Sequence, residues 1–148
     1  ADSFTPADEK LIPTGELSPV SGTPMDFRDF RVIGDEIDSD YDQIRNGGGF
    51  DNNWVLLGEG FKKAAAVFSP KSGIRMSVET TKPGLQFYSG NFLKGVIPGK
   101  AGAAYGKRTG FCLETQYFPD SPSHSRFPSA VLRAGEEYRH KTVYGFGL

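Results

Sequence analysis

Glu114 is the residue of this chain whose surroundings most suggest acid–base chemistry. It is the one acidic residue of the run GFCLETQYF, which is otherwise largely apolar. Because side chains alternate along a strand, Glu114 is expected on the face opposite Phe111 and Leu113. If that face forms a cleft, partial desolvation would raise the pKa of Glu114 and suit it to general base catalysis. Taken alone, the pattern is explained more simply by a solvent-facing glutamate or by an ion pair with a buried arginine.

Three other residues have the chemistry of a site for a hydroxylated ligand. Gln86 alternates with the apolar Leu85 and Phe87, and its amide both donates and accepts hydrogen bonds, as sugar hydroxyls require. Asp51 stands between a glycine run and the start of a strand, where an aspartate more commonly bonds nearby backbone amides. Trp54 offers a ring for stacking on a sugar, although tryptophan in such a segment more commonly packs in a core.

The residues that most often bind metals are too few and too scattered to predict a metal site. The two histidines are His124, in the loop DSPSHSRFPS, and His140, among the charges of the last strand. Neither has a cysteine or a second histidine at ligand spacing, so both are predicted to be structural or surface residues. Cys112 is predicted to be a small buried hydrophobic residue that shares a face with Glu114. No dinucleotide or P-loop motif occurs, and we expect neither a metal nor a cofactor.

Charge and composition limit the partners and the compartment. Seventeen basic and eighteen acidic residues give a net charge of -1, which provides no electrostatic attraction to nucleic acid or to an anionic membrane. No apolar run approaches the ~18 residues of a membrane span. The single cysteine and the lack of signal-peptide character in ADSFTPADEK favour a cytoplasmic protein. Secretion stays open, because a signal could lie upstream of Ala1.

The 148 residues predict one domain of short antiparallel strands. Nineteen glycines and ten prolines leave little room for long helices. Residues 1–30 are interpreted as extended pieces joined by turns, and apolar spacing from Ile33 to Ile44 predicts one short helix, ended by the glycines at 47–49. Strands are predicted within the segments 53–58, 63–70, 72–81, 83–92, 110–118 and 136–146. The predicted fold class is all-β, in the form of a mainly antiparallel sandwich.

Five blocks of the chain together resemble the galactose mutarotase (aldose 1-epimerase) family. They are LIPTGELSPVSGTPMDFR, GFDNNWVL, TTKPGLQFYSGNF, GFCLETQYFPDSPSHSRFPS and GEEYRHKTVYGF, which follow one another in the family's order. The resemblance implies the family's large β-sandwich, the supersandwich, with residues 1–148 forming the C-terminal half of its single domain. It also implies that the N-terminal half is a separate polypeptide or a further segment of this one. In the family that half supplies an Asn-Arg pair and two histidines, one of them the proposed general acid.

The resemblance assigns roles to three residues. Glu114, in its Leu-Glu-Thr-Gln context, matches the catalytic base, while Asp51 and Gln86 match residues that bind sugar hydroxyls. Asn52 departs from the family pattern, since many members have histidine there. The implied reaction is the interconversion of the α and β anomers of an aldohexose such as galactose or glucose, without metal or cofactor. A non-catalytic sugar-binding or regulatory module and a hexose-phosphate epimerase of the same superfamily are the alternatives.

Overall fold

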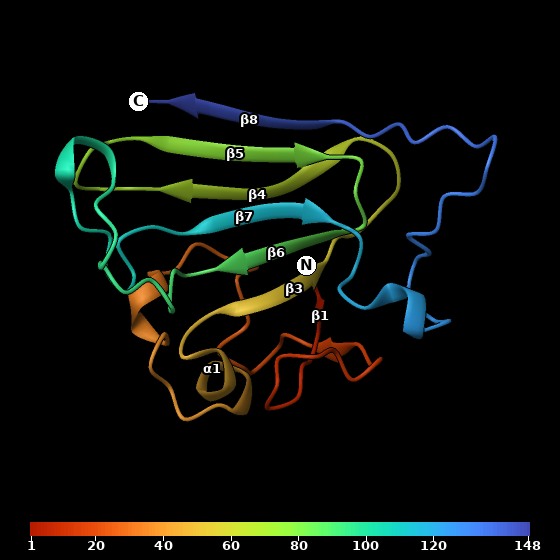
Figure 1. Cartoon of the computed structure of the whole chain (residues 1–148), viewed down its shortest axis with the longest axis horizontal. Helices are drawn as coiled ribbons and strands as arrows, with labels where there is room; N and C mark the ends of the chain where they lie inside the picture. The colour runs from red at the N-terminus through yellow and green to blue at the C-terminus, as the bar shows by residue number, and fades with distance from the viewer.

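The computed structural model describes residues 1–148 and contains two antiparallel sheets (Figure 1). The five-stranded sheet has the order β2-β1-β3-β6-β7, with β1 at Ser3–Thr5, β2 at Ser18–Pro19, β3 at Asp51–Val55, β6 at Gly84–Tyr88 and β7 at Cys112–Gln116. The three-stranded sheet has the order β4-β5-β8, with β4 at Lys62–Phe68, β5 at Arg75–Thr80 and β8 at Thr142–Gly147. Every strand pair is antiparallel, so the predicted all-β fold class is confirmed.

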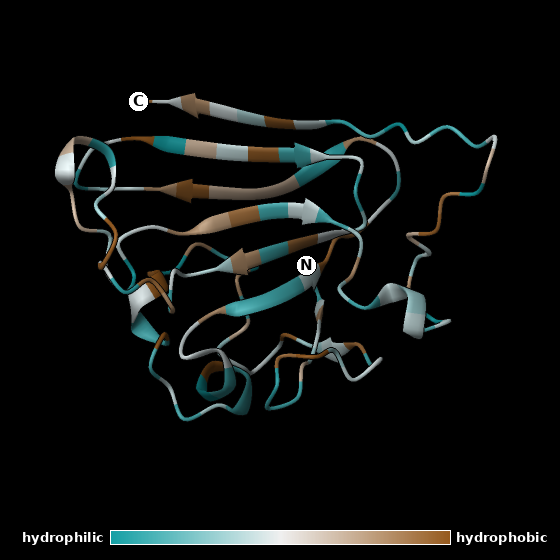
Figure 2. Ribbon diagram, in the orientation of Figure 1, coloured by the Kyte–Doolittle hydropathy of each residue, from teal (hydrophilic) through white to brown (hydrophobic).

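The main core lies against one face of the five-stranded sheet. Trp54 of β3 and Phe87 of β6 enter this core, and Figure 2 shows alternating hydrophobic and hydrophilic bands along β6. The segment between β2 and β3 folds across this face and supplies the opposing side chains. The buried members of this core are Phe4, Val20, Met25, Ile37, Ile44, Phe50, Trp54 and Phe87. Burial of these side chains stabilises the fold by about 25 cal/mol for each Å² of apolar area removed from water.

A second, smaller core joins the two sheets. Val78 of β5 packs with Leu85 of β6 and with Leu56. Hydrogen bonds between side chains and backbone strengthen the contact, since the Tyr144 hydroxyl donates to the Leu113 carbonyl at 2.7 Å. Leu85 and Phe87 lie on the same face of β6. The three-stranded sheet covers this face at Leu85, and the main core covers it at Phe87.

The single helix predicted from Ile33 to Ile44 is wrong in extent. The structure has a short 3-10 helix, η1, at Ile33–Asp35 and a separate α-helix, α1, at Asp42–Gly47. Asp38, Ser39 and Asp40, which lie between them, are weak helix formers. Asp38 instead forms an ion pair with Arg108 at 2.6 Å, which holds the intervening chain in an irregular path. The predicted glycine end of the helix is confirmed, because Gly48 caps α1 in the left-handed conformation with φ of 61°.

Most predicted strands occur, with shifted ends. The strand predicted from residue 53 begins earlier, at Asp51, and the one predicted from residue 136 begins only at Thr142. Two further 3-10 helices lie in the loops, η2 at Lys100–Gly102 and η3 at Ser121–Ser123. No helix in the structure has both the length and the apolar character needed to cross a membrane.

Candidate functional site

Asp51, Gln86 and Glu114 lie on one face of three adjacent strands, β3, β6 and β7. Gln86 stands directly opposite Glu114 in the β6–β7 ladder and directly opposite Asn53 in the β3–β6 ladder. Asp51 is two residues before Asn53, and two residues along a strand return to the same face. Directly opposed residues on one face have Cβ atoms about 4.5–5.5 Å apart, so the three polar side chains form one compact group.

Asp51 and Gln86 are hydrogen bonded to each other. The Nε2 of Gln86 donates to Oδ1 of Asp51 at 2.8 Å. Burial raises the pKa of the Asp51 carboxyl, and the hydrogen bond from Gln86 opposes that shift. The pair therefore presents an oriented acceptor and an oriented amide on the same face, both able to bond the hydroxyl groups of a ligand.

Glu114 is exposed on this face, with Cys112 beside it. The two residues are two positions apart on β7, so their side chains lie on the same face. Partial burial raises the pKa of the Cys112 thiol, and the carboxylates of Glu114 and Asp51 raise it further. The prediction that Cys112 is a small buried residue is wrong, because its side chain is exposed. It is the first residue of β7, where it pairs with Tyr88 of β6, and the other edge of β7 has no further strand of this chain.

Trp54 lies on the opposite face and cannot stack on a ligand held by these side chains. It is three residues from Asp51, an odd separation, which places it in the main core with an exposure of 7%. Its indole Nε1 donates to the Met25 carbonyl at 2.9 Å. We correct the predicted stacking role accordingly. Asn52 also faces away from Asp51, and its amide donates to Oε1 of Gln43 at 3.0 Å.

Neither histidine belongs to the face that carries Glu114. His124 packs against Phe127 with ring centroids 5.0 Å apart, and its Nε2 lies 3.2 Å from the Pro13 carbonyl oxygen. It thereby ties the loop after β7 to the N-terminal segment. A side chain on Gly15 would collide with the His124 ring, so glycine is required there.

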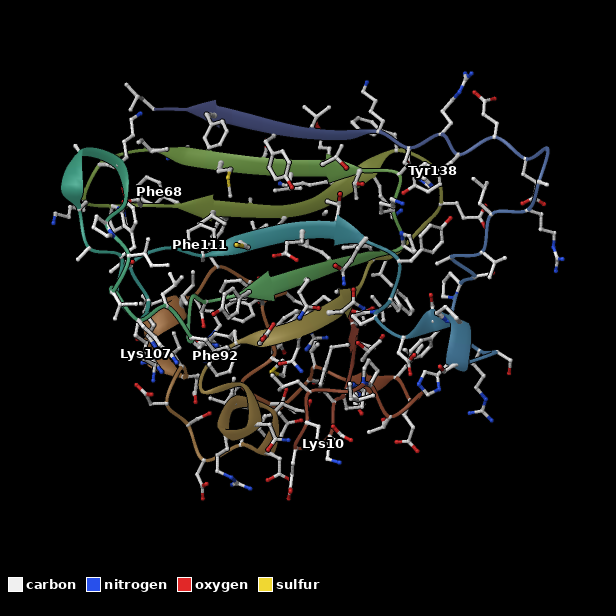
Figure 3. All side chains as sticks on the ribbon, in the orientation of Figure 1. Lys10, Phe68, Phe92, Lys107, Phe111 and Tyr138 are labelled. Atoms are coloured by element: carbon white, nitrogen blue, oxygen red, sulfur yellow. The ribbon has the colours of Figure 1, made fainter.

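His140 belongs to a separate cluster where the chain passes from β5 to β6. Its ring nitrogens lie 3.1 Å from the Thr81 hydroxyl and 3.3 Å from the Tyr117 hydroxyl. Lys82 is nearly buried in the same cluster, donates to the hydroxyl of Tyr138 (labelled in Figure 3), and lies over the rings of both tyrosines. Burial lowers the pKa of His140, and the charge of Lys82 lowers it further.

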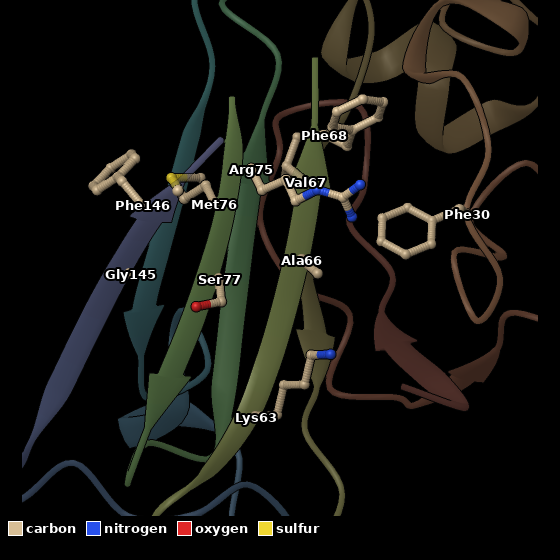
Figure 4. Close-up of a pocket in the computed structure, with 11 residues that line it drawn as sticks. Phe30, Lys63, Ala66, Val67, Phe68, Arg75, Met76, Ser77, Gly145 and Phe146 are labelled. Atoms are coloured by element: carbon tan, nitrogen blue, oxygen red, sulfur yellow. The ribbon is translucent and has the colours of Figure 1, made fainter. Parts of the chain in front are cut away.

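Two grooves of the surface lie away from Asp51, Gln86 and Glu114. One groove, of about 440 Å³, lies over the three-stranded sheet, with Phe30 on one side and Phe146 on the other (Figure 4). Another, of about 390 Å³, lies between Tyr117 and the segment 129–140. No group of three His, Cys, Asp or Glu side chains is arranged to hold a metal ion.

Asn53 is the residue of this face that sequence reasoning missed. It is directly opposite Gln86 and is almost completely buried, with an exposure of 1%. Asn53 lies two residues after Asp51 on the same strand, and this spacing predicts that the two side chains share a face.

The fold of this chain is that of a known protein family. A family model described as aldose 1-epimerase matches residues 1–145, and the chain belongs to that family. It is 47% identical to a galactose mutarotase from Homo sapiens over 149 residues, which cover 100% of this chain and 42% of the relative. It is 43% identical to an aldose 1-epimerase from Escherichia coli (strain K12) over 150 residues, covering 99% of this chain and 43% of the relative.

Solved structures show the same fold. The GalM/aldose epimerase homologue from C. elegans superposes with a TM-score of 0.81 at 28% sequence identity, covering 99% of this chain and 43% of the other. A galactose 1-epimerase from Lactobacillus acidophilus NCFM gives a TM-score of 0.73 at 27% identity, covering 99% of this chain and 42% of the other. The galactose mutarotase-like fold is therefore established. The chain spans about two fifths of the length of these relatives.

Proposed function

We propose that this chain contributes the base and the sugar-orienting residues of an aldohexose mutarotase, which interconverts α and β anomers. The observation that carries the proposal is the joint placement of Asp51, Gln86 and Glu114 on one face of three adjacent strands. It occurs in a chain that matches the aldose 1-epimerase family along residues 1–145.

The chemistry requires a base and an acid on a correctly oriented sugar. Glu114, exposed as a carboxylate, accepts the proton of the C1 hydroxyl while an acid protonates the ring oxygen, and the ring opens. Rotation about the C1–C2 bond then presents the other face of C1 to the ring oxygen. The two proton transfers are reversed, and the ring closes as the other anomer. Asp51 and Gln86 bond the remaining hydroxyls and hold C1 toward Glu114, which lowers the entropic part of the barrier.

The acid is proposed to come from a companion segment that corresponds to the remaining length of the relatives. Neither His124 nor His140 lies on the face of Glu114, because each is engaged elsewhere in the fold. The outer edges of β7 and β8 carry no further strand, and Phe146 of β8 is 72% exposed. Unpaired edges and exposed aromatic side chains are typical of a surface that another segment covers.

Polarimetry of freshly dissolved α-galactose and α-glucose tests the proposal. The 148-residue chain alone is expected to accelerate mutarotation little. Addition of the N-terminal half of the human galactose mutarotase, as a separate polypeptide, is expected to give a clear acceleration. Rapid mutarotation by the chain alone would contradict the proposed division of the site. Saturable binding of galactose to the complex without acceleration would instead indicate a non-catalytic sugar-binding module.

A further inference from the structure

Tyr88 places an aromatic ring on the face that carries Asp51, Gln86 and Glu114. It is two residues after Gln86 on β6, so the two side chains share a face. It stands directly opposite Asp51 in the β3–β6 ladder and directly opposite Cys112 in the β6–β7 ladder. The proposed sugar site therefore has an aromatic residue on its middle strand, next to the amide that bonds Asp51.

Asp51 and Tyr88 form the closer of the two kinds of residue pair that occur in an antiparallel sheet. The backbone N–H of Ser89 donates to the Phe50 carbonyl at 2.9 Å, so a hydrogen bond joins the neighbouring pair. Hydrogen-bonded and non-hydrogen-bonded pairs alternate along such a ladder. Asp51 and Tyr88 are therefore a non-hydrogen-bonded pair, whose Cα atoms are about 4.5 Å apart and whose side chains lie close together.

Phe92 holds the Tyr88 ring in place. The Tyr88 hydroxyl accepts a hydrogen bond from the backbone N–H of Phe92 at 2.8 Å. The two rings are stacked, with an interplanar angle of 22° and centroids 6.3 Å apart, and Phe92 is labelled in Figure 3. A ring that is already held in this way loses little conformational entropy when a ligand packs on it.

An aldohexose needs an apolar contact as well as hydrogen bonds. Its hydroxyl groups surround the edge of the ring, and its C–H groups lie on the faces, so a binding site combines a few polar groups with apolar or aromatic surface. Trp54 and Phe87 point to the opposite face, into the main core. Tyr88 is the only aromatic residue that β3, β6 and β7 place on the polar face, and it is partly exposed there.

We propose that the C–H face of the sugar packs on the ring of Tyr88, and that Phe92 supports this ring from behind. The inference rests on the proposed function and gives Tyr88 the stacking role that Trp54 cannot fill. The C–H groups on the face of the sugar take no part in the two proton transfers. The contact is therefore equally strong in the bound sugar and in the transition state, and it contributes to affinity and not to kcat.

Tyr88→Leu tests the inference in the complex with the N-terminal half of the human galactose mutarotase. We expect KM for galactose to rise about three- to tenfold while kcat changes little, because an aromatic contact contributes a factor of this size. Tyr88→Phe keeps the ring and should restore the wild-type KM. Tyr88→Val, whose branched side chain favours a strand, repeats the measurement if the leucine variant does not fold. An equal rise of KM in Tyr88→Phe and Tyr88→Leu would assign the contact to the hydroxyl and overturn the inference.

The NMR spectrum of the bound sugar gives a readout that a purely structural tyrosine would not change. A proton above the face of an aromatic ring resonates upfield. In a ligand-observed titration with galactose, C–H protons of the sugar should therefore shift upfield on binding to the wild type and to Tyr88→Phe. The same protons should not shift upfield on binding to Tyr88→Leu.

Phe111→Leu is the matched control. Phe111 immediately precedes Cys112, the residue opposite Tyr88, and its side chain is 41% exposed. Its ring contacts Phe87 on the other face of the sheet, with centroids 6.2 Å apart, and Phe111 is also labelled in Figure 3. The substitution removes an accessible aromatic ring near the site without touching the polar face. KM and the upfield shifts should remain those of the wild type.

The outcomes separate this inference from the proposed function. If the wild-type complex is active and Tyr88→Leu keeps both the wild-type KM and the upfield shifts, the inference is overturned and the proposed function stands. A wild-type complex that neither binds galactose nor accelerates mutarotation would overturn the sugar site itself, and this inference with it.

Discussion

Nε2 of Gln86 donates a hydrogen bond to Oδ1 of Asp51 at 2.8 Å. Gln86 lies on β6, the strand between β3, which carries Asp51, and β7, which carries Glu114. This bond places an amide in the middle of the polar face, with one carboxylate on each side. A change at Gln86 therefore affects the orientation of Asp51.

Glu114→Gln should remove the base and little else. In the complex with the N-terminal half, we expect turnover to fall by about 10²–10⁴-fold, the range that general base catalysis contributes. The Michaelis constant should change little, because the amide keeps the size of the carboxylate, and the exposed position should leave circular dichroism unchanged. Glu79→Gln, in β5 of the other sheet, is the control and should keep full activity. A Glu114→Gln enzyme of nearly normal rate would assign the base to another residue.

Gln86→Leu should raise the pKa of Asp51 further above its ordinary value. The hydrogen bond from Gln86 lowers that pKa against the effect of burial, and leucine leaves only the burial. NMR titration of the Asp51 carboxyl carbon measures the shift, with Gln116→Leu on the same face as the control.

The same substitution should change the dependence of stability on pH. A carboxyl group whose pKa is raised on folding holds its proton longer in the folded state, so stability declines as pH rises from the unfolded value of 3.8 to the folded value. In Gln86→Leu this decline should be larger and should extend to higher pH. Urea unfolding between pH 3 and 7 measures it, and a smaller decline than in the wild type would contradict the role given to the hydrogen bond.

Substitution of Trp54 should lower the stability of the core, and the fluorescence of Trp54 should not respond to a bound sugar. Trp54→Ala is expected to cost about 3–5 kcal/mol of unfolding free energy, as for other buried aromatic residues. Trp54→Phe should cost about 1–2 kcal/mol, because the hydrogen bond to the Met25 carbonyl is lost. As Trp54 is the only tryptophan, its fluorescence can be followed directly. Addition of galactose should leave its emission maximum unchanged, and a marked shift would mean that the ring lies close to the sugar.

His140 should make the protein less stable at mildly acidic pH. Its pKa is lowered on folding, so the unfolded chain takes up a proton first as pH falls. The stability that the neutral ring contributes is complete above the unfolded pKa of 6.5 and is lost progressively as pH falls below it toward the folded value. The groups that face the ring are the hydroxyls of Thr81 and Tyr117, the ring of Tyr138 and the ammonium of Lys82.

Urea unfolding between pH 5 and 8 measures this loss. His140→Gln should flatten the dependence on pH, because glutamine does not titrate. Lys82→Met should weaken the dependence without abolishing it, since burial of the ring remains when the charge is gone. An equal loss of stability on acidification in His140→Gln would assign the effect to other groups.

Local alternation was enough to predict the strands that matter most for the site. Leu85 and Phe87 on one side of Gln86 define a half-buried strand whatever its neighbours are, and the structure confirms β6 there. The helix prediction failed because the spacing of Ile33, Ile37 and Ile44 was interpreted as one helical face. Ile37 and Ile44 are both buried, but only Ile44 lies in α1, whereas Ile37 reaches the core from the irregular chain next to the Asp38–Arg108 pair. Apolar spacing reports burial, and burial is reached by more than one backbone path.

The sequence by itself determined which side of each strand is polar. It therefore determined that Glu114 faces away from Leu113 and that Trp54 and Asp51, three residues apart, face opposite ways. Only the tertiary structure decided that β3, β6 and β7 are adjacent, that Gln86 bonds Asp51, and that Asn53 is enclosed beside them. Side-chain direction follows from the geometry of one strand, whereas strand order and register depend on contacts between residues far apart in the sequence, such as Asn53 and Gln86. Those contacts are chosen by the packing of the whole core, which no single segment specifies.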